Sequence, residues 1–225
     1  PVVIIDEAHN ARTPLSYDSF ARLRPAALIE MTATPLRQGR HRSNVLYHVS
    51  AEELKAESKA VLERDVKELS DAQELLWASD TYALLVVFQA MDAAGKDSSI
   101  EHVMSGVNPQ GVQVVSFKQP SSEELDHNFL WRYMRALPER GRIGIFNRSY
   151  YEDVLVVKVH PEYLGKLPPG KIDGSFWEKR YDDINRFERH LVRNGTVILK
   201  FFLNVSKKEQ KRRFEARMTD PLRQW

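Results

Sequence analysis

The chain has 225 residues, enough for one large domain or for one domain with part of another. Lys and Arg number 33 and Asp and Glu number 31, and the resulting net charge of +2 argues against nucleic acid as a partner. The absence of cysteine excludes disulfides and thiolate metal sites, and no apolar run approaches the roughly 20 residues that span a bilayer, so we expect a cytoplasmic protein with no membrane partner.

Two short apolar runs near the start of the chain are each followed by a polar motif. Residues 2–5 precede an Asp-Glu-Ala-His box at 6–9, and residues 27–31 precede Thr-Ala-Thr-Pro at 32–35. Residues 1–57 resemble superfamily 2 helicases on these motifs, specifically the translocase subunit of type III restriction enzymes. In such enzymes the first motif is the Walker B element and the second couples nucleotide state to DNA.

The helicase resemblance implies roles for three residues of the first motif. Asp6 would hold magnesium through water, Glu7 would polarise the attacking water, and His9 would take part in coupling. Such an ATPase also needs a Gly-Lys-Ser/Thr loop before the box and an arginine-bearing second lobe after it, and this sequence shows neither. We interpret residues 1–57 as a truncated, vestigial helicase-like segment, whose strands we expect in a different sheet from that of the remaining chain.

A long amphipathic helix is predicted next, and it crosses the boundary that we place after Glu57. Ser50 and Glu53 form a capping box, and the helical spacing continues to about Ser79. The positions on the packed face are Leu54, Val61, Leu62, Val66, Leu69, Gln73 and Leu76. Residues 58–225 then form the second predicted domain.

A buried strand and a phosphate-binding loop follow this helix. Residues 82–88 are continuously apolar, as a strand covered on both faces requires. Residues 90–97 approach the pattern G-x-x-x-x-G-K-S/T, with Ala90 at the first glycine and Asp97 at the Ser/Thr, before a helix that runs to Met104. We expect Ala90 to take a positive φ at a cost of roughly 1 kcal/mol. Amides at this helix start, with the Lys96 ammonium, would bind phosphate.

The remaining sequence alternates between strands and helices. Strands are predicted at 112–117, 143–146 and 196–203, and helices from 121 or 122 to 137, from near 149, and over 176–193. Ser206 and Glu209 form a capping box for a last, basic helix that Pro221 ends. This alternation predicts an α/β fold with a parallel sheet and helices on both faces.

Residues 58–225 resemble the polyphosphate:nucleotide phosphotransferase family (polyphosphate kinase type 2). The resemblance rests on residues 91–97, 102–111, 125–132, 137–152 and 206–225. It implies a P-loop kinase-like sheet with a helical lid, of which this chain carries only the first part. It also implies magnesium-dependent transfer of a terminal phosphoryl group between inorganic polyphosphate and a nucleotide, as ADP/ATP or AMP/ADP. Members of the family often associate, so a homo-oligomer is also expected.

The loop and the resemblance together give the predicted site. The catalytic residues are Asp92, Lys96 and Arg148, and Asp92 and Asp97 are the candidate magnesium ligands. Phosphate- and nucleotide-binding residues are predicted to be Ala93, Ala94, Gly95, Asp97, Lys118, Arg132, Asn147, Glu152, Arg213 and Arg217, with Arg140 as a further candidate. Many family members have Asp where Asn147 stands, and Glu152 is the candidate to supply the missing negative charge.

Three functions stay open at this point. The first is the polyphosphate-dependent phosphotransferase, and the second is a nucleic-acid-dependent ATPase fragment built on the Asp-Glu-Ala-His box. The third is a catalytically inactive fusion or truncation that at most binds nucleotide. Formation of ATP or ADP from polyphosphate would favour the first of these, and DNA-stimulated ATP hydrolysis the second.

Overall fold

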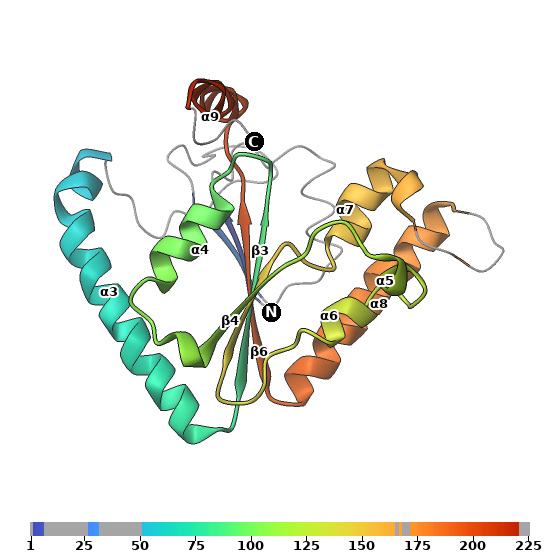
Figure 1. Ribbon diagram of the computed structural model, residues 1–225, viewed down its shortest axis with the longest axis horizontal. Helices are drawn as coiled ribbons and strands as arrows, with labels where there is room; N and C mark the ends of the chain where they lie inside the picture. Colours follow the sequence, from blue (N-terminus) through green and yellow to red (C-terminus); the bar gives the residue numbers. More distant parts are fainter. Residues whose placement is uncertain (1, 7–26, 32–50, 165–166, 168–171, 221–225) are drawn as a thin grey trace.

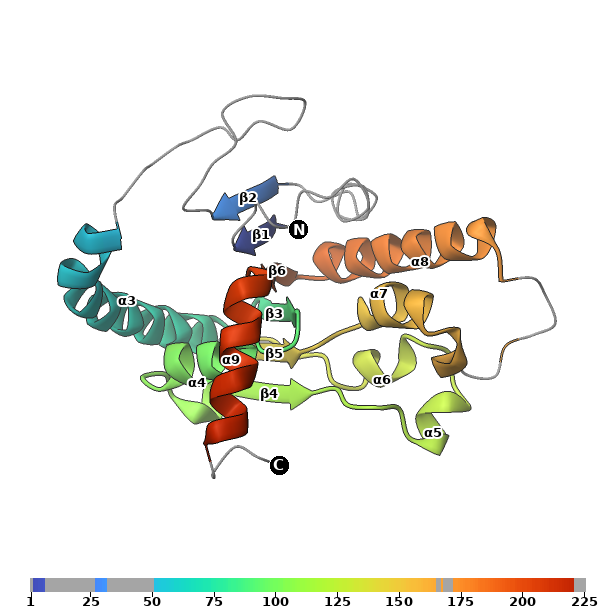
Figure 2. The ribbon, with the colours of Figure 1, turned by 90° about the horizontal axis from the view of Figure 1, so that it is seen from above.

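The computed structural model describes residues 2–6, 27–31, 51–164, 167 and 172–220, and its strands form one sheet. The strands are β1 (Val2–Asp6), β2 (Ala27–Met31), β3 (Ala83–Ala90), β4 (Val112–Ser116), β5 (Ile143–Asn147) and β6 (Thr196–Leu203). Their order is β2-β1-β6-β3-β5-β4, visible in Figure 2, and all neighbours are parallel. The predicted parallel sheet is confirmed.

Helices cover both faces of the sheet, as predicted (Figure 1). One face carries α3 (Ala51–Ser79) and α4 (Lys96–Met104), and the other carries α5 (Ser122–Leu125), α6 (Trp131–Met134), α7 (Glu152–Val159) and α8 (Gly174–Arg193). Two 3₁₀ turns, η1 (Pro109–Gly111) and η2 (Pro161–Tyr163), complete these layers, and α9 (Lys207–Thr219) lies at the carboxyl end of the strands. No described helix has the length and apolar content needed to cross a membrane.

The central strand β3 is apolar except at Gln89 because both of its faces are covered. Leu85 and Val87 join a core cluster with residues of α7 and α8, whereas Val86 and Phe88 join a second cluster on the α3 and α4 side. Leu85 and Val87 are 0% and 1% exposed. Since neighbouring residues of a strand point to opposite faces, a continuous apolar run is what this position requires.

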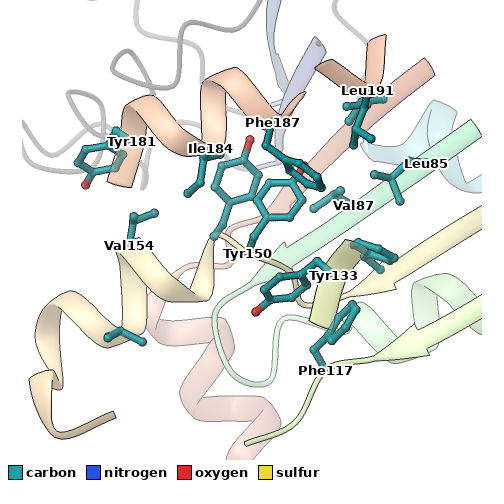
Figure 3. Packing of buried hydrophobic residues seen from close by; sticks show 14 of the residues in the cluster. Leu85, Val87, Phe117, Tyr133, Tyr150, Val154, Tyr181, Ile184, Phe187 and Leu191 are labelled. Atoms are coloured by element: carbon teal, nitrogen blue, oxygen red, sulfur yellow. The ribbon is translucent and has the colours of Figure 1, made fainter. Parts of the chain in front are cut away.

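Aromatic side chains fill the larger core cluster, and Tyr150 lies at its centre (Figure 3). The Tyr150 ring packs edge-on against Tyr133 and Phe187, with ring centroids 5.7 and 5.5 Å apart. Tyr150 follows β5 and Phe187 belongs to α8, so this packing joins the end of β5 to the helix layer. This packing against the helix layer fixes the position of the segment that follows β5.

The N-terminal strands belong to the same sheet as β3, contrary to our expectation of separate sheets. β1 pairs with β6 in parallel, with Val2 opposite Leu199, and β2 pairs with β1. The free edge of β6 accepts a parallel strand because its other edge already pairs with β3. Glu7, His9 and Ser50 lie outside the described residues, and the helicase-like assignment of residues 1–57 stays a prediction.

The predicted helix from residue 121 or 122 to 137 is wrong as a single helix. The structure has α5, then a turn, then α6. Asn128 accounts for the break, because its side-chain Oδ1 accepts a hydrogen bond from the Leu130 amide at 3.1 Å and its carbonyl accepts one from Trp131 at 3.0 Å. Such side-chain bonds to the local backbone compete with helix formation.

The predicted ends of the last two helices are only partly confirmed. Helix α8 ends at Arg193 before Gly195, whose φ of 89° is of the kind expected at a C-terminal cap. At α9 the Ser206 side chain accepts from the Glu209 amide at 3.2 Å, but the reciprocal half of the capping box is replaced. The Glu209 carboxylate accepts from Arg212 and Arg213 instead.

A buried ion pair connects β6 to α8 behind the end of β5. The Lys200 ammonium lies 2.8 Å from Glu188 Oε2, and these side chains are 4% and 2% exposed. The same carboxylate accepts hydrogen bonds from the hydroxyls of Tyr150 and Tyr151, and Lys200 also donates to Tyr151. Burial lowers the pKa of Lys200 and raises the pKa of both tyrosines. Strand β6, helix α8 and the turn between β5 and α7 therefore share one buried charge pair.

Replacement of Glu188 by Gln should strongly destabilise the protein. The change leaves the Lys200 ammonium buried without its counter-charge, which typically costs about 3–5 kcal/mol. Urea unfolding monitored by circular dichroism measures the loss. The matched control is Asp182→Asn on the same helix, which removes an exposed pair with Arg186 and should cost less than about 1 kcal/mol. Equal effects of the two changes would contradict the interpretation of the buried pair.

A second polar group, Asp153, is half-buried near the start of α7. Its carboxylate lies 3.3 Å from Arg180 Nη1 and accepts from the Tyr133 hydroxyl at 3.1 Å. Burial raises the pKa of Asp153 to about 6, and the nearby Arg180 opposes this rise without cancelling it. The folded protein therefore holds a proton here at a pH where the unfolded chain has already released it.

The unfolding free energy should carry a pH dependence that belongs to Asp153. Because the folded pKa is raised, this contribution is fully present below about pH 4 and is lost as the pH rises through about 6, a change of about 1–3 kcal/mol. Urea unfolding of the unaltered chain and of Asp153→Asn, compared from about pH 4 to about pH 7, isolates this contribution. A stability difference that does not change with pH would contradict it.

Candidate functional site

The candidate site begins where β3 ends and the chain turns into α4. Ala94 donates its amide to the Met91 carbonyl at 3.1 Å, and Gly95 caps the helix with a φ of 89°. The backbone strain lies at Ala93, whose φ is 62°, and not at Ala90 as the sequence led us to expect. Ala90 continues the strand, paired with Leu203, so the loop starts later than in the pattern used for the prediction.

The amides of Ala93, Gly95 and Lys96 in this loop have no protein acceptor among the described residues. The amide of Ala94, which we also expected to bind phosphate, is instead used inside the turn. Amides at a helix N-terminus that lack partners form a preferred place for an anion, because the helix dipole adds to their partial charges. The loop therefore offers three donors and the positive end of α4.

Lys96 crosses from this loop to the end of the neighbouring strand β5. Its ammonium donates to the Asn147 side-chain oxygen and lies 3.5 Å from Asp97 Oδ1. Only 12% of the Lys96 side chain is exposed, whereas 78% of the Asp97 side chain is. β3 and β5 are adjacent and parallel, so the residues that follow them meet at one edge of the sheet. The prediction that Lys96 and Asn147 share a site is consistent with this geometry.

The Asp97 carboxylate is held in its charged form by its neighbours. Asn147 Nδ2 donates to Asp97 Oδ1 at 2.6 Å. This hydrogen bond lowers the pKa of Asp97, and the Lys96 ammonium lowers it further against the effect of burial. Asn147 thus bridges a cation and an anion, accepting from one with its oxygen and donating to the other with its nitrogen. An Asp at this position could not make both contacts, because a carboxylate has no N–H to donate.

Arg148 and Glu152 come from the turn between β5 and α7. Arg148 has a φ of 66° and donates its amide to the Phe88 carbonyl at 3.0 Å. Its guanidinium is 47% exposed and lies 3.8 Å from both Asp92 and Glu152, so no close ion pair immobilises it. A guanidinium beside the loop that is held only by long ion pairs can clamp phosphate oxygens.

Two polar residues that the sequence prediction missed support this turn. Gln89, the penultimate residue of β3, is 6% exposed and donates to Glu152 Oε1 at 2.8 Å. Ser149 is fully buried and reaches Gln89 at 3.4 Å. A polar residue in an otherwise apolar buried strand was the available signal, because a buried amide needs partners. Glu152 is therefore tied to β3 and not free as a surface carboxylate.

Helix α9 contacts the loop directly. Arg213 Nη1 donates to the Ala93 carbonyl at 3.1 Å, and Gln210 Nε2 donates to the Asp92 carbonyl at 2.7 Å. A Cβ on Gly95 would lie 3.2 Å from Arg213 Nη1, so glycine permits this close approach. Arg217, the other predicted lid residue, is exposed. The sequence pattern gave no signal for Gln210.

The other predicted basic residues lie between β4 and β5 in the sequence, and they differ in their exposure and contacts. The Arg132 side chain is 10% exposed, donates to the Lys118 carbonyl at 2.8 Å and stacks over the Phe117 ring at 5.1 Å. Lys118 and Arg140 are exposed. Arg132 therefore has a packing role in this structure, and the assignment of these three residues to a phosphate channel stays a prediction.

The carboxylates next to the loop decide how a metal ion could be held. Asp92 and Asp97 are both exposed oxygen donors, of the kind that magnesium prefers. Within the described parts of the chain no group of three or more His, Cys, Asp or Glu side chains lies together. The donors present therefore fit magnesium bound by one or two carboxylates with water and phosphate oxygens completing its shell. Asp6 ends β1, and Glu7 and His9 are outside the described residues.

Comparison with known proteins places this site in a family. The model of the family Polyphosphate kinase 2 (PPK2) matches residues 52–225. The chain is 59% identical over 168 residues to an ADP-polyphosphate phosphotransferase of Rhodopseudomonas palustris, covering 73% of this chain and 58% of that protein. It is 48% identical over 169 residues to an AMP/ADP-polyphosphate phosphotransferase of Meiothermus ruber, covering 75% of this chain and 59% of that protein.

A solved structure agrees with these sequences. The crystal structure of Polyphosphate Kinase 2 from Arthrobacter aurescens TC1 matches with a TM-score of 0.72 at 38% identity, covering 86% of this chain and 69% of that one. The chain spans less than two thirds of the length of the two relatives named above. The family match extends over most of the chain and includes the loop, the end of β5 and α9. This chain is therefore a member of the polyphosphate kinase 2 family.

Proposed function

We propose that this protein transfers a terminal phosphoryl group between inorganic polyphosphate and a nucleoside mono- or diphosphate. The observation that carries the proposal is the Lys96 ammonium, largely shielded from solvent beside the unpaired loop amides and tied to Asn147. Phosphoryl transfer needs positioning and charge neutralisation more than covalent help, and these groups supply both. The names of the relatives, which include ADP and AMP/ADP phosphotransferases, support this substrate class.

The proposed reaction assigns a task to each group. A terminal oxygen of the acceptor nucleotide attacks the end phosphorus of polyphosphate, and the bond from that phosphorus to its bridging oxygen breaks, leaving a shortened chain. The amides of Ala93, Gly95 and Lys96 hold the phosphate oxygens, and the Lys96 ammonium follows the charge that is transferred. Arg148 turns from its distant carboxylate neighbours to grip the oxygens in two places.

Magnesium is part of the proposal, with Asp92 and Asp97 as its protein ligands. When bound, the ion neutralises charge on the phosphate oxygens. Asn147 and Lys96 hold Asp97 with one oxygen engaged, and the Asp92 side chain is 78% exposed beside the loop. Lys118, Arg132, Arg213 and Arg217 are the proposed phosphate contacts beyond the loop. The cytoplasmic location and the homo-oligomer stay predictions, as do the helicase-like segment 1–57 and an inactive fusion or truncation.

Replacement of Lys96 by Ala should abolish most of the phosphotransferase activity. The loss of one positioned charge at a phosphoryl transfer site is expected to slow the reaction about 10²- to 10³-fold. The measurement is ATP formation from ADP, magnesium and polyphosphate, with AMP as a second acceptor. Lys67→Ala, on the exposed face of α3, is the matched control and should leave the rate unchanged.

Three other results of the same assay would contradict the proposal. An unchanged rate in Lys96→Ala would remove this lysine from the site. DNA-stimulated ATP hydrolysis without polyphosphate would favour the nucleic-acid-dependent ATPase. Binding of nucleotide without turnover in the unaltered chain would favour the inactive product.

The two carboxylates should differ from other surface acids in their effect on magnesium dependence. Asp92→Asn and Asp97→Asn should each raise the magnesium concentration at half-maximal rate several-fold, because each removes a charged oxygen ligand. Glu101→Gln on the exposed face of α4 is the control. If Asp97→Asn matches the control while Asp92→Asn does not, Asp92 is the only ligand of the pair. If both match the control, neither residue holds the metal.

A further inference from the structure

The turn at residues 91–94 has a strained conformation that the sequence alone does not favour. The bond from the Ala94 amide to the Met91 carbonyl closes the turn, and its third residue, Ala93, has a φ of 62°. Asp92, the second residue, has no positive φ. This combination defines a type II turn, which normally places Gly or Asn at the third position. Alanine is sterically disfavoured there, because its Cβ approaches the carbonyl oxygen.

The peptide between Asp92 and Ala93 is the one whose orientation distinguishes a type II from a type I turn. A type I turn would give Ala93 an ordinary negative φ, so relaxation of the strain means rotation of this peptide. Its carbonyl belongs to Asp92 and its amide to Ala93, and in a trans peptide these two point in opposite directions. Whatever holds the carbonyl therefore also fixes the direction of the Ala93 amide.

Gln210 of α9 holds that carbonyl. Its side-chain amide donates to the Asp92 oxygen at 2.7 Å, and Arg213, one turn later in α9, donates to the next carbonyl, that of Ala93, at 3.1 Å. Glu209 fixes the Arg213 guanidinium in turn, at 2.7 Å. Two successive carbonyls are thus directed toward α9, and the Ala93 amide, which has no acceptor among the described residues, is directed away from it.

We propose that Gln210 is a positioning residue that keeps the turn at residues 91–94 in its type II form, so that the Ala93 amide is available to bind a phosphoanhydride chain. This inference rests on the proposed function, since it concerns how the same loop receives phosphate. A loop that surrounds an anion must direct its amides inward and its carbonyls outward, and α9 supplies the outward partners. Gln210 does not contact the substrate itself.

The alternative is that the Gln210 contact only anchors α9 to the loop. A double-mutant cycle between Gln210→Met and Ala93→Gly separates the two roles. Methionine keeps the length of the side chain but removes its donor, and glycine adopts the type II turn without strain. If Gln210 acts on the turn, its loss matters when residue 93 is alanine and matters little when residue 93 is glycine. An anchor for α9 would matter equally in both backgrounds.

The measurement is binding of inorganic tripolyphosphate and, separately, of ADP, by isothermal titration calorimetry in the presence of magnesium. In the alanine background Gln210→Met should weaken binding roughly three- to ten-fold. This is the effect expected when one hydrogen bond is lost and the strained turn at Ala93 can relax. In the glycine background the same change should weaken binding less than about two-fold. The ligand that shows this pattern, tripolyphosphate or ADP, is the one whose phosphates occupy the turn.

Lys211→Met is the matched control, since Lys211 neighbours Gln210, is 77% exposed and, within the described part of the chain, forms its ion pair with Glu215 of the same helix. It should bind both ligands as the unaltered chain does. Equal weakening by Gln210→Met in both backgrounds, or no weakening in either, overturns the proposal while leaving the Lys96 result intact. Failure of the unaltered chain to bind either ligand overturns it together with the proposed function.

Discussion

The position of Lys96 depends on the confinement of β3 on all four sides. The strand has β5 on one edge and β6 on the other, with helices against both faces, so it can neither slide nor tilt without breaking two ladders and two cores. A loop that leaves such a strand starts from a fixed point. Because β5 is fixed to β3 in register, Asn147 stands opposite Phe88, and the Lys96 ammonium can reach it from the helix that follows the loop.

The charges at this point balance one another before any phosphate is bound. Lys96 is balanced by Asp97 and by the oxygen of Asn147, and Arg148 by Asp92 and Glu152 at a longer distance. Cations without such neighbours would repel each other as they gathered around one loop. Under the proposed function, an incoming polyanion would replace these negative partners, so the substrate would not need to bring the cations together.

The sequence predicted most of the sheet, because the strands are rich in apolar residues and begin or end at turn residues. β6 was predicted with its observed bounds, and β5 within one residue. The pairing of β1 with β6 could not be predicted, since the apolar pattern of a strand does not identify its neighbour in the sheet. The broken helix after Ser121 was missed because one asparagine side chain, Asn128, outweighs the local propensity.

For the candidate site, the meeting of the loop with the end of β5 could be predicted, since both follow adjacent parallel strands. The contacts between distant elements could not. Gln210 meets Asp92 from 118 positions away, and neither residue carries a pattern that indicates the other. The ion pair between Lys200 and Glu188 could not be predicted either, because a charged residue in a sequence gives no sign that it will be buried with a partner. Such pairs follow from the packing, which only the structure provides.

The left-handed backbone of Arg148 has a consequence for how this protein can be improved. Arginine at a φ of 66° is less stable than glycine would be, since glycine has no side chain to crowd the carbonyl. Selection of variants for heat resistance alone would favour glycine at this position and would remove a guanidinium from beside the loop. Under the proposed role of Arg148, resistance to heat and reactivity would compete at a single residue, and any programme that screens for the first would have to assay the second in the same round.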